Sequence, residues 1–520
     1  MKIANRIILF IVLCFLSGCM VGPDYSSPTM EMPSRWSGDA KSVFLESPDT
    51  NNPGWWKVFG DSDLDNLIDI AIANNCDVRA SAYRVEASRA SRDYTSGQYW
   101  PDINAKGSRK RSQASKDGVV QMSKEPDPMN INSGGFDFMW EIDLFGRIRR
   151  SVESANASYQ ASIEDYHDVM VTLIAEVCRN YIELRTSQAQ IAYAQDNIKI
   201  QQDTLELTKS RYEAEIAGEL DVRQAELNLA NTQAEIPSLR IAEAAAINRL
   251  SVLLGKMPET MREQLSQTKT LPYSKIETEN LTSLLMPADM LRQRPDIRRA
   301  ERQLAAQTAQ IGVATADLYP SLQLSGTFEI HSRHLSGLGN IHNKAYSFGP
   351  NLQWNLFDAN RIKNTIKMEK AGTQELLANW ENTVLSAAED VENAITSYAQ
   401  QRQRKESLDN SVKASLRSLE LVENLYKNDL TDFQNVLITQ RALFAQQNKL
   451  AASQGQVLQA LVQVYKGFGC GWQNSVNALQ LETAKKSMQK NGAKNSSAKK
   501  INLTHRELPG RTKGRLESYE

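Results

Sequence analysis

Apolar side chains recur at every seventh position over two long stretches of this chain, and no other feature restricts its fold as strongly. The first stretch consists of Ile163, Met170, Val177, Leu184, Ile191, Ile198, Leu205 and Tyr212. A shift of 214 residues gives the second, in which Lys405 is the one polar break; it consists of Leu377, Val384, Val391, Tyr398, Lys405, Val412, Leu419 and Tyr426. A seven-residue repeat sustained this long is typical of helices packed as left-handed coiled coils. The sequence therefore predicts two long, closely packed helices, and the fixed shift indicates a duplicated chain.

Each long helix is expected to end in a turn, after which a second helix runs back along it. Between Ser151 and Gly218 there is no proline or glycine, so one helix of about 100 Å fits at about 1.5 Å per residue. Gly218 is the expected turn of the first copy, and residues 428–432 are that of the second. Each repeat therefore holds a very long helical hairpin, preceded by a shorter helix.

A change from helix to strand occurs twice, at GQYWPDINAKG (97–107) and ADLYPSLQLSG (316–326). Proline and the restricted residue before it end a helix, and apolar and polar residues alternate beyond each proline. This predicts two strands per repeat with an aromatic-rich apolar face and a polar face, the weakest being the strand that carries only Ile103 and Ala105 on its apolar face.

Strands of this kind are typical of outer-membrane barrels, and a soluble sheet packed on the helices is the alternative. Four strands cannot close a barrel, for which about eight is the smallest number. Two chains would supply eight strands and three chains twelve, and the alternation does not choose between them.

The N-terminus predicts a lipoprotein signal. Lys2 and Arg6 precede an apolar run of ten residues, 7–16, which is too short to span a bilayer and suits a signal peptide. The following Leu-Ser-Gly-Cys resembles a bacterial lipobox, in which the chain is cut before Cys19 and this cysteine is acylated; an ordinary signal peptide with a chance cysteine is the alternative. Met20, rather than an aspartate, follows Cys19 and favours transport to the outer membrane.

We therefore expect six segments. They are a signal peptide (1–18), a lipidated extended segment (19–52), a first repeat (53–258), a linker (259–286), a second repeat (287–472) and a disordered tail (473–520) with ten Lys or Arg against four Asp or Glu.

Nothing in the sequence points to an enzyme, a cofactor or a nucleic-acid partner. The formal net charge is −1, and no nucleotide loop or Ser/His/Asp grouping occurs. His331, His334 and His342 lie within twelve residues of one loop, but no carboxylate or cysteine completes a metal site there. Three cysteines remain in the mature chain, Cys76, Cys178 and Cys470, and we expect them to be buried and unpaired.

Several short motifs resemble the TolC-like outer membrane factors, specifically the NodT-like branch of lipoproteins that serve RND-type efflux pumps. They are Cys-Met-Val-Gly-Pro-Asp-Tyr (19–25), Trp-Trp (55–56) with Phe59 and Asp61, Asp-Leu-Phe-Gly-Arg (143–147), Leu-Leu-Gly (253–255), and Arg-Pro-Asp-Ile (294–297) with Glu301. The resemblance covers about residues 19–472. It implies an α+β outer membrane factor, built from duplicated coiled-coil hairpins with two strands each. It also implies a homotrimer, in which a twelve-stranded β-barrel in outer-membrane lipid continues into a periplasmic α-helical barrel.

The resemblance further implies hairpin tips near Gly218 and Thr431 that meet a periplasmic adaptor, a membrane fusion protein, and close the tube. The residues matched to this periplasmic aperture are Asp221, Glu226, Ile438 and Arg441. Ile438 departs from relatives that place an aspartate there. Three Ile438 side chains would form a hydrophobic constriction that closes by dewetting, or Ile438 packs between helices, the interpretation we favour.

The predicted function is a passive exit channel in the cell outer membrane, lipid-anchored and barrel-inserted, for drugs or other small amphiphiles. An inner-membrane RND pump would supply the energy through the adaptor. The alternatives are the channel of an ABC-driven (type I) export system and a structural lipoprotein that braces the periplasm without a pore.

Overall fold

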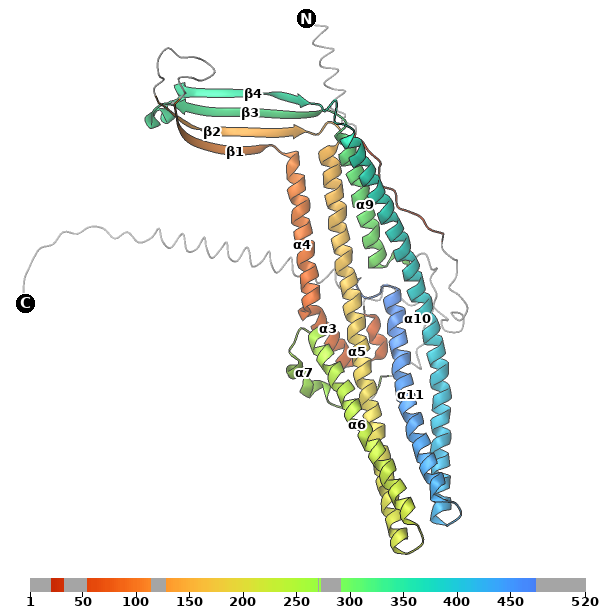
Figure 1. Ribbon diagram of the computed structural model, residues 1–520. Helices are drawn as coiled ribbons and strands as arrows, with labels where there is room; N and C mark the ends of the chain where they lie inside the picture. The colour runs from red at the N-terminus through yellow and green to blue at the C-terminus, as the bar shows by residue number, and fades with distance from the viewer. Residues whose placement is uncertain (1–19, 32–53, 114–127, 270, 273–290, 474–520) are drawn as a thin grey trace, which may run out of the picture.

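The computed structural model describes residues 20–31, 54–113, 128–269, 271–272 and 291–473, and they form an elongated molecule. A four-stranded sheet lies at one end, and a layer of helices runs away from it to two hairpin tips at the other end (Figure 1). Within the described part of the chain, no helix combines the length and the apolar character needed to cross a membrane.

The two repeats contain matching elements. The first repeat has α4 (Cys76–Ser96), β1 (Asp102–Ser112), β2 (Met129–Ile142), α5 (Arg147–Glu213) and α6 (Glu219–Leu253). The second has α9 (Pro295–Ala316), β3 (Ser321–Ser332), β4 (Lys344–Gln353), α10 (Arg361–Lys427) and α11 (Phe433–Gly467). The long helices α5 and α10 have 67 residues each, and the returning helices α6 and α11 have 35 each. The structure confirms the duplication and both hairpins.

All neighbouring strands are antiparallel, in the order β1, β2, β3, β4. The register places Ala105, Phe136, Phe328 and Tyr346 in one row across the sheet, so that the apolar residues of the four strands share a face. An equivalent hydrogen bond lies at the helical end of the strands in both repeats. The indole Nε1 of Trp140 donates to Tyr99 O, and that of Trp354 donates to Leu318 O, each at 3.0 Å.

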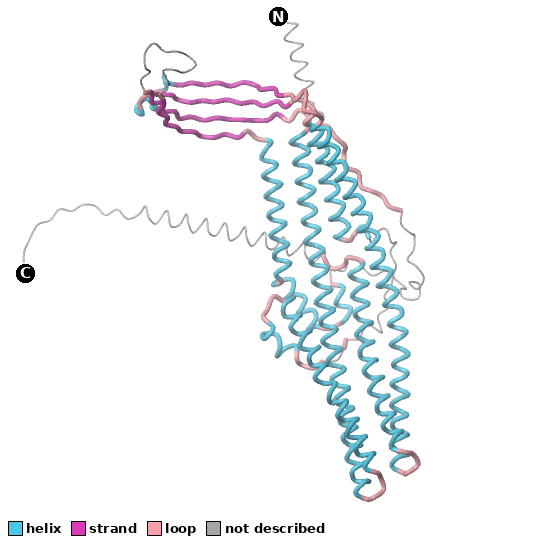
Figure 2. The backbone as a smooth tube through the Cα atoms, viewed as in Figure 1, coloured by secondary structure: helices cyan, strands magenta, loops and turns pink. Residues whose placement is uncertain are grey.

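The long helices lie side by side in one layer (Figure 2). Near the sheet the order of packing is α4, α5, α9, α10; toward the tips it is α6, α5, α11, α10. The long helices α5 and α10 run the full length of the helical part. Beside α5, α4 occupies the part near the sheet and α6 the part near the tips. Between α5 and α10, α9 and α11 divide the length in the same way. The layer therefore ends in α4 and α6 along one edge and in α10 along the other.

The main core lies midway along the helices. Met170, Val177 and Leu184 of the seven-residue pattern are fully buried there, and the ring of Trp55, in η1 (Trp55–Phe59), stacks on Tyr465 of α11 at 4.7 Å. The helix α3 (Ser62–Asn74) packs against α5 in the same region. The start of the expected linker forms a helix, α7 (Pro258–Leu265), because Met261 and Leu265 are buried in this core. Residue 270 and residues 273–286 of that linker lie outside the described residues.

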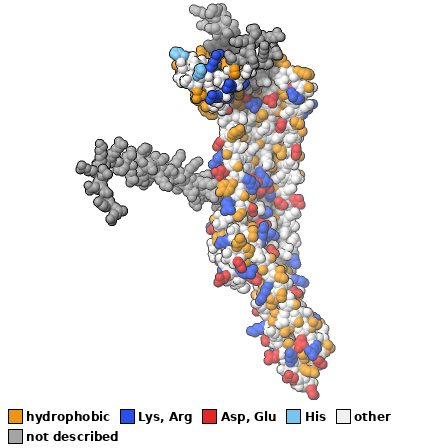
Figure 3. All heavy atoms as spheres, turned by 60° about the vertical axis from the view of Figure 1, so that its left-hand side comes forward, with side chains coloured by type: hydrophobic (Ala, Val, Ile, Leu, Met, Phe, Trp, Pro, Cys, Tyr) orange, Lys and Arg blue, Asp and Glu red, His pale blue; other side chains and the backbone are white. Residues whose placement is uncertain are grey.

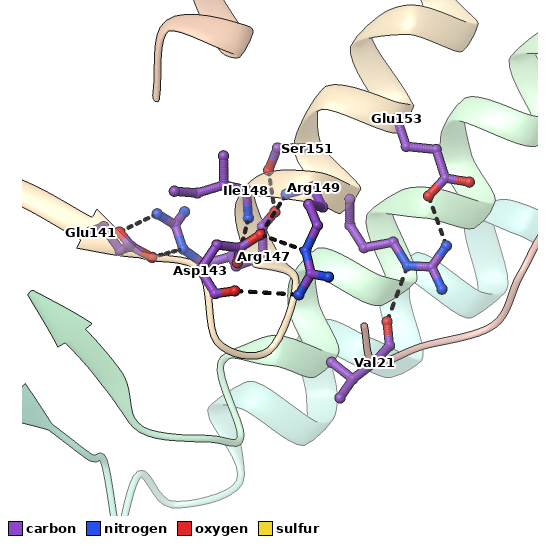
Figure 4. Close-up of polar contacts among 9 residues, drawn as sticks. Val21, Glu141, Asp143, Arg147, Ile148, Arg149, Ser151 and Glu153 are labelled. Carbon is purple, nitrogen blue, oxygen red and sulfur yellow. Dashed lines mark hydrogen bonds and ion pairs between the residues drawn. The ribbon is translucent and has the colours of Figure 1, made fainter. Parts of the chain in front are cut away.

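A sharp turn joins β2 to α5, and acidic side chains fix it (Figure 4). The Asp143 carboxylate accepts the backbone N–H groups of Ile148 (3.2 Å) and Arg149 (2.9 Å), which have no partner within the helix. Arg147 donates twice to Glu141, at 2.8 and 2.5 Å. In the second repeat Asp358 accepts from Ile362 N at 2.7 Å, and Asn360 (φ 65°) takes the left-handed conformation that Gly146 (φ 84°) takes in the first.

The segment that follows Cys19 is held against this turn. Arg150 is 1% exposed, and it donates to Val21 O at 3.1 Å and pairs with Asp24 and Glu153, each at 2.7 Å. Gly22 has φ 91°, and a Cβ there would lie 2.4 Å from Gly312 Cα. Cys19, the signal peptide, most of the 19–52 segment and the tail lie outside the described residues.

The cysteines follow the prediction only in part. Cys178 and Cys470 are buried, as expected, but Cys76 is exposed. Cys76 is the first residue of α4, directly after its cap Asn75, and the residues that this helix buries are Val78, Ser81 and Val85. The prediction of a buried thiol was therefore wrong for Cys76.

Candidate functional site

The two hairpin tips have the same geometry. Five residues, 214–218, join α5 to α6, and five residues, 428–432, join α10 to α11. Glu215 (φ 61°) and Asp429 (φ 58°) occupy the same left-handed position in the two loops. The next amide then donates back to the helix in both, from Ile216 to Arg211 O and from Leu430 to Leu425 O at 2.9 Å. Gly218 directly precedes α6, and Thr431 lies in the second loop.

The first hairpin holds the tip of the second. The guanidinium of Arg211, near the end of α5, forms an ion pair with Asp429 and lies 4.8 Å above the ring of Tyr426. A small apolar cluster lies directly behind this contact. Its buried members are Ala225, Tyr426, Phe433, Val436 and Leu437. Because these residues come from α6, α10 and α11, the cluster packs the two hairpins together.

Beyond the apolar cluster, four polar side chains link the hairpins. Gln440 of α11 donates to Thr204 Oγ1 of α5 at 2.7 Å and accepts from the Asn228 amide of α6 at 3.4 Å. Arg441 Nε donates to Asn228 Oδ1 at 3.0 Å. Thr204, Asn228 and Gln440 are all buried. We call this chain of hydrogen bonds the amide network. Leaving a buried amide without its hydrogen-bond partner costs free energy, so the amide network resists any separation of α11 from α5 and α6.

The residues predicted for the aperture have different surroundings. Arg441 belongs to the amide network. Glu226 instead lies within the first hairpin, 3.5 Å from Lys209 and 3.0 Å from Arg223, and the hydrogen bond from Arg223 lowers the pKa of Glu226. Asp221 lies in the first turn of α6, where a carboxylate complements the helix dipole. Acidic and basic side chains mix over this end of the molecule (Figure 3).

Ile438 does not pack between helices within one protomer, since its side chain is 54% exposed. It follows Val436 and Leu437, which are buried in the cluster, and so projects from the outer side of α11. Both interpretations of Ile438 therefore remain predictions about the assembled copies.

Three members of the amide network, Thr204, Asn228 and Gln440, were not predicted from the sequence. Gln440 occupies an apolar position in the stripe of α11 that also contains Phe433, Val436, Leu437 and Leu443. A lone polar residue in such a stripe often specifies register, and this was the signal available. Elsewhere among the described residues, no three metal-ligating side chains come together.

An amphipathic four-stranded sheet continued by duplicated coiled-coil hairpins is the fold of the outer membrane factors, a class of channel proteins. The solved outer-membrane channel OprN is similar in structure, with a TM-score of 0.81, 33% identity, and coverage of 88% of this chain and 100% of that one. Nodulation protein T of Rhizobium leguminosarum bv. trifolii is 31% identical over 84% of this chain and 91% of its own length. The toluene efflux pump outer membrane protein TtgI of Pseudomonas putida is 30% identical over 89% of this chain and 98% of its own length.

The family model described as Outer membrane efflux protein matches residues 67–256 and 286–469. The chain belongs to this family. The two matched segments correspond to the two structural repeats.

Proposed function

We propose that three copies of this chain form the outer-membrane exit duct of a tripartite RND-type efflux system. The duct conducts drugs or other small amphiphiles passively from an inner-membrane pump and a periplasmic adaptor to the outside. The observation that carries this proposal is the pair of open edges along the protomer.

The open edges run through both parts of the molecule. Among the described strands, β1 and β4 each pair on one side only, and an unpaired strand edge seeks a partner. The helices at the same two edges also carry exposed apolar side chains. They are Leu220, Leu227 and Ile241 on α6, and Met368, Leu385, Leu416, Leu421 and Leu425 on α10. Joining edge to edge closes a ring, and three copies supply twelve strands and twelve helices at each level.

The chemistry of the sheet supports its insertion in the outer membrane. Phe136, Phe328 and Tyr346 are exposed on one face, as lipid-facing barrel residues are. Met20, the residue after Cys19, packs against Gly146 beside the sheet. Acyl chains on Cys19 would therefore anchor the protein at the same end as the barrel, each buried CH₂ adding about 0.8 kcal/mol.

We assign the hairpin tips at Gly218 and Thr431 to adaptor binding, and the residues behind them to the periplasmic aperture. In this assignment Asp221, Glu226, Ile438 and Arg441 surround the aperture, and the amide network holds it closed. The names of similar proteins support organic cargo, since TtgI belongs to a toluene efflux pump and SrpC of Pseudomonas putida to a solvent efflux pump. CusC of Escherichia coli, which is named for cation efflux, is 27% identical.

Photocrosslinking in cells tests the proposed partners. A photoreactive residue at position 218 is expected to capture an RND adaptor or pump, whereas the same residue at Tyr94, exposed on α4 near the sheet, serves as the control and captures neither. Capture of an ABC-type adaptor at position 218 would instead indicate that the protein is the channel of a type I export system. Capture of the same proteins at both positions would contradict the assignment of the tip.

A further inference from the structure

The lipid-facing side of the sheet ends in basic residues. On β1, alternation places Ile103, Ala105, Gly107, Arg109 and Arg111 on one face. The register puts Gly107 in a row with Gly134, Ile330 and Lys344, and the row beyond it consists of Arg109, Asn132 and Ser332. Ile330 is thus the last apolar side chain on this face, and Lys344, Arg109 and Arg111 lie level with it or beyond it. The end of the sheet farthest from the helices shows Lys, Arg and His side chains beside hydrophobic ones (Figure 3).

The polar face of the same strands is paired internally. Lys106 lies 2.9 Å from Asp137, and His331 lies 2.9 Å from Glu329. The hydroxyls of Ser108 and Ser133 lie 2.8 Å apart. These charges and hydroxyls on the polar face therefore satisfy one another.

The basic residues on the apolar face differ from Lys106 and His331 on the polar face. Arg109, Arg111 and Lys344 are exposed, and none forms an ion pair with another described residue. Unpaired guanidinium groups on a lipid-facing surface leave five donors each for an anionic ligand.

The height of these residues above the helical end of the sheet indicates which layer of the membrane surrounds them. From Ile142, at the helical end, to Gly134 is eight residues, or about 27 Å along a strand at about 3.4 Å per residue. With a tilt of about 40°, this row lies about 21 Å above Ile142, near the limit of an apolar band about 25 Å tall. On the same scale Arg109 lies at about 26 Å and Arg111 at about 31 Å, which is the depth of the outer headgroups.

We propose that Arg109 and Arg111 bind the phosphate groups of an outer-leaflet glycolipid of the lipid A class, with Lys344 as a third contact. Guanidinium groups match phosphate bidentately. Lys344 lies on β4, the opposite edge of the sheet from β1, so ring closure brings it to the same seam as Arg109 of the next copy. The inference rests on the proposed function, because it requires a closed barrel whose far end reaches the outer leaflet.

The test compares lipid binding by two variants of the full-length protein. Arg109→Gln combined with Arg111→Gln removes two of the three lipid-facing charges and leaves Lys344, and Lys110→Gln removes the intervening charge on the polar face. Each protein is titrated in nanodiscs with bisphosphorylated lipid A, dephosphorylated lipid A or phosphatidylglycerol. One basic residue near an anionic surface contributes about fivefold in affinity, so the double variant should bind bisphosphorylated lipid A about 30-fold more weakly, and Lys110→Gln should match the parent protein.

Three results would overturn the inference: equal lipid A binding by the double variant and the parent protein, an equal loss in Lys110→Gln, or equally tight binding of phosphatidylglycerol. Single-channel conductance of the same protein preparations, reconstituted in planar bilayers, separates failure of the glycolipid site from failure of the duct. Normal conductance without preference for lipid A refutes only the glycolipid site, whereas no conductance in any sample refutes the duct and the inference with it.

Discussion

Replacing Asn228 with alanine breaks the amide network at its centre. The variant removes the acceptor of Arg441 (3.0 Å) and a long contact to Gln440 (3.4 Å), while Gln440 keeps Thr204. Because Asn228 is on α6 and its partners are on α11, the loss weakens the junction between the two hairpins and leaves each hairpin intact.

The size of the effect follows from the bonds lost. A hydrogen bond to a charged group contributes about 1.5–3 kcal/mol, but Arg441 is exposed and water replaces part of its bond, so about 1 kcal/mol per protomer is the expected cost. Three protomers opening together give about 3 kcal/mol, and each 1.4 kcal/mol changes an equilibrium about tenfold. The population of open apertures should therefore rise about a hundredfold.

Single-channel recording in planar bilayers measures this population. Asn228→Ala is expected to open far more often than the parent protein at the same voltage. Asn435→Ala is the matched control, since its amide bonds only Thr431 of its own tip, at 2.9 Å, and should leave gating unchanged. Equal open probability for Asn228→Ala and the parent protein would refute the role of the amide network.

Three further variants probe other parts of the molecule. Ile438→Asp should change conductance and raise cation selectivity if this exposed side chain faces the lumen, and unchanged values would exclude that position. Burial raises the pKa of Asp168, and Arg299 offsets part of this increase. The carboxyl group therefore favours the folded state at acid pH and loses that contribution as the pH rises through its folded pKa. Asp168→Asn should raise the melting temperature more at pH 7 than at pH 4, and a difference that does not depend on pH would contradict this. Gly22→Ala should expose residues 20–31 to protease, because its Cβ would lie 2.4 Å from Gly312 Cα, whereas Gly97→Ala, with open space around it, should not; equal cleavage would count against the docked segment.

The repeat architecture could be predicted because it depends on local patterns. A seven-residue period specifies packed long helices, aromatic-proline pairs end the shorter ones, and a single shift of 214 residues superposes the two tips. These features need no knowledge of which segments meet in space.

The two tips nevertheless differ in a way the pattern does not reveal. Tyr426 is 5% exposed, whereas Tyr212, its counterpart, is 46% exposed. Arg211 and Phe433 cover Tyr426, while the position that corresponds to Phe433 in the first repeat is Glu219. Glu219 in place of a phenylalanine therefore removes one of the two kinds of contact that bury the end of the stripe in the second copy.

The amide network could not be predicted for a different reason. Gln440 and Thr204 are 236 residues apart, and their pairing depends on α11 packing against α5 of the other repeat. The prediction named Arg441 but not its partner Asn228, because the two residues are 213 positions apart in the sequence and meet only through packing of α11 against α6.

Current through a planar bilayer that contains only the purified full-length protein is the decisive test of the duct. We expect discrete, stepwise conductance from an assembly whose mass corresponds to three chains. An assembly of three chains that inserts but passes no current, in the parent protein and in Asn228→Ala alike, would show that the protein is not a duct.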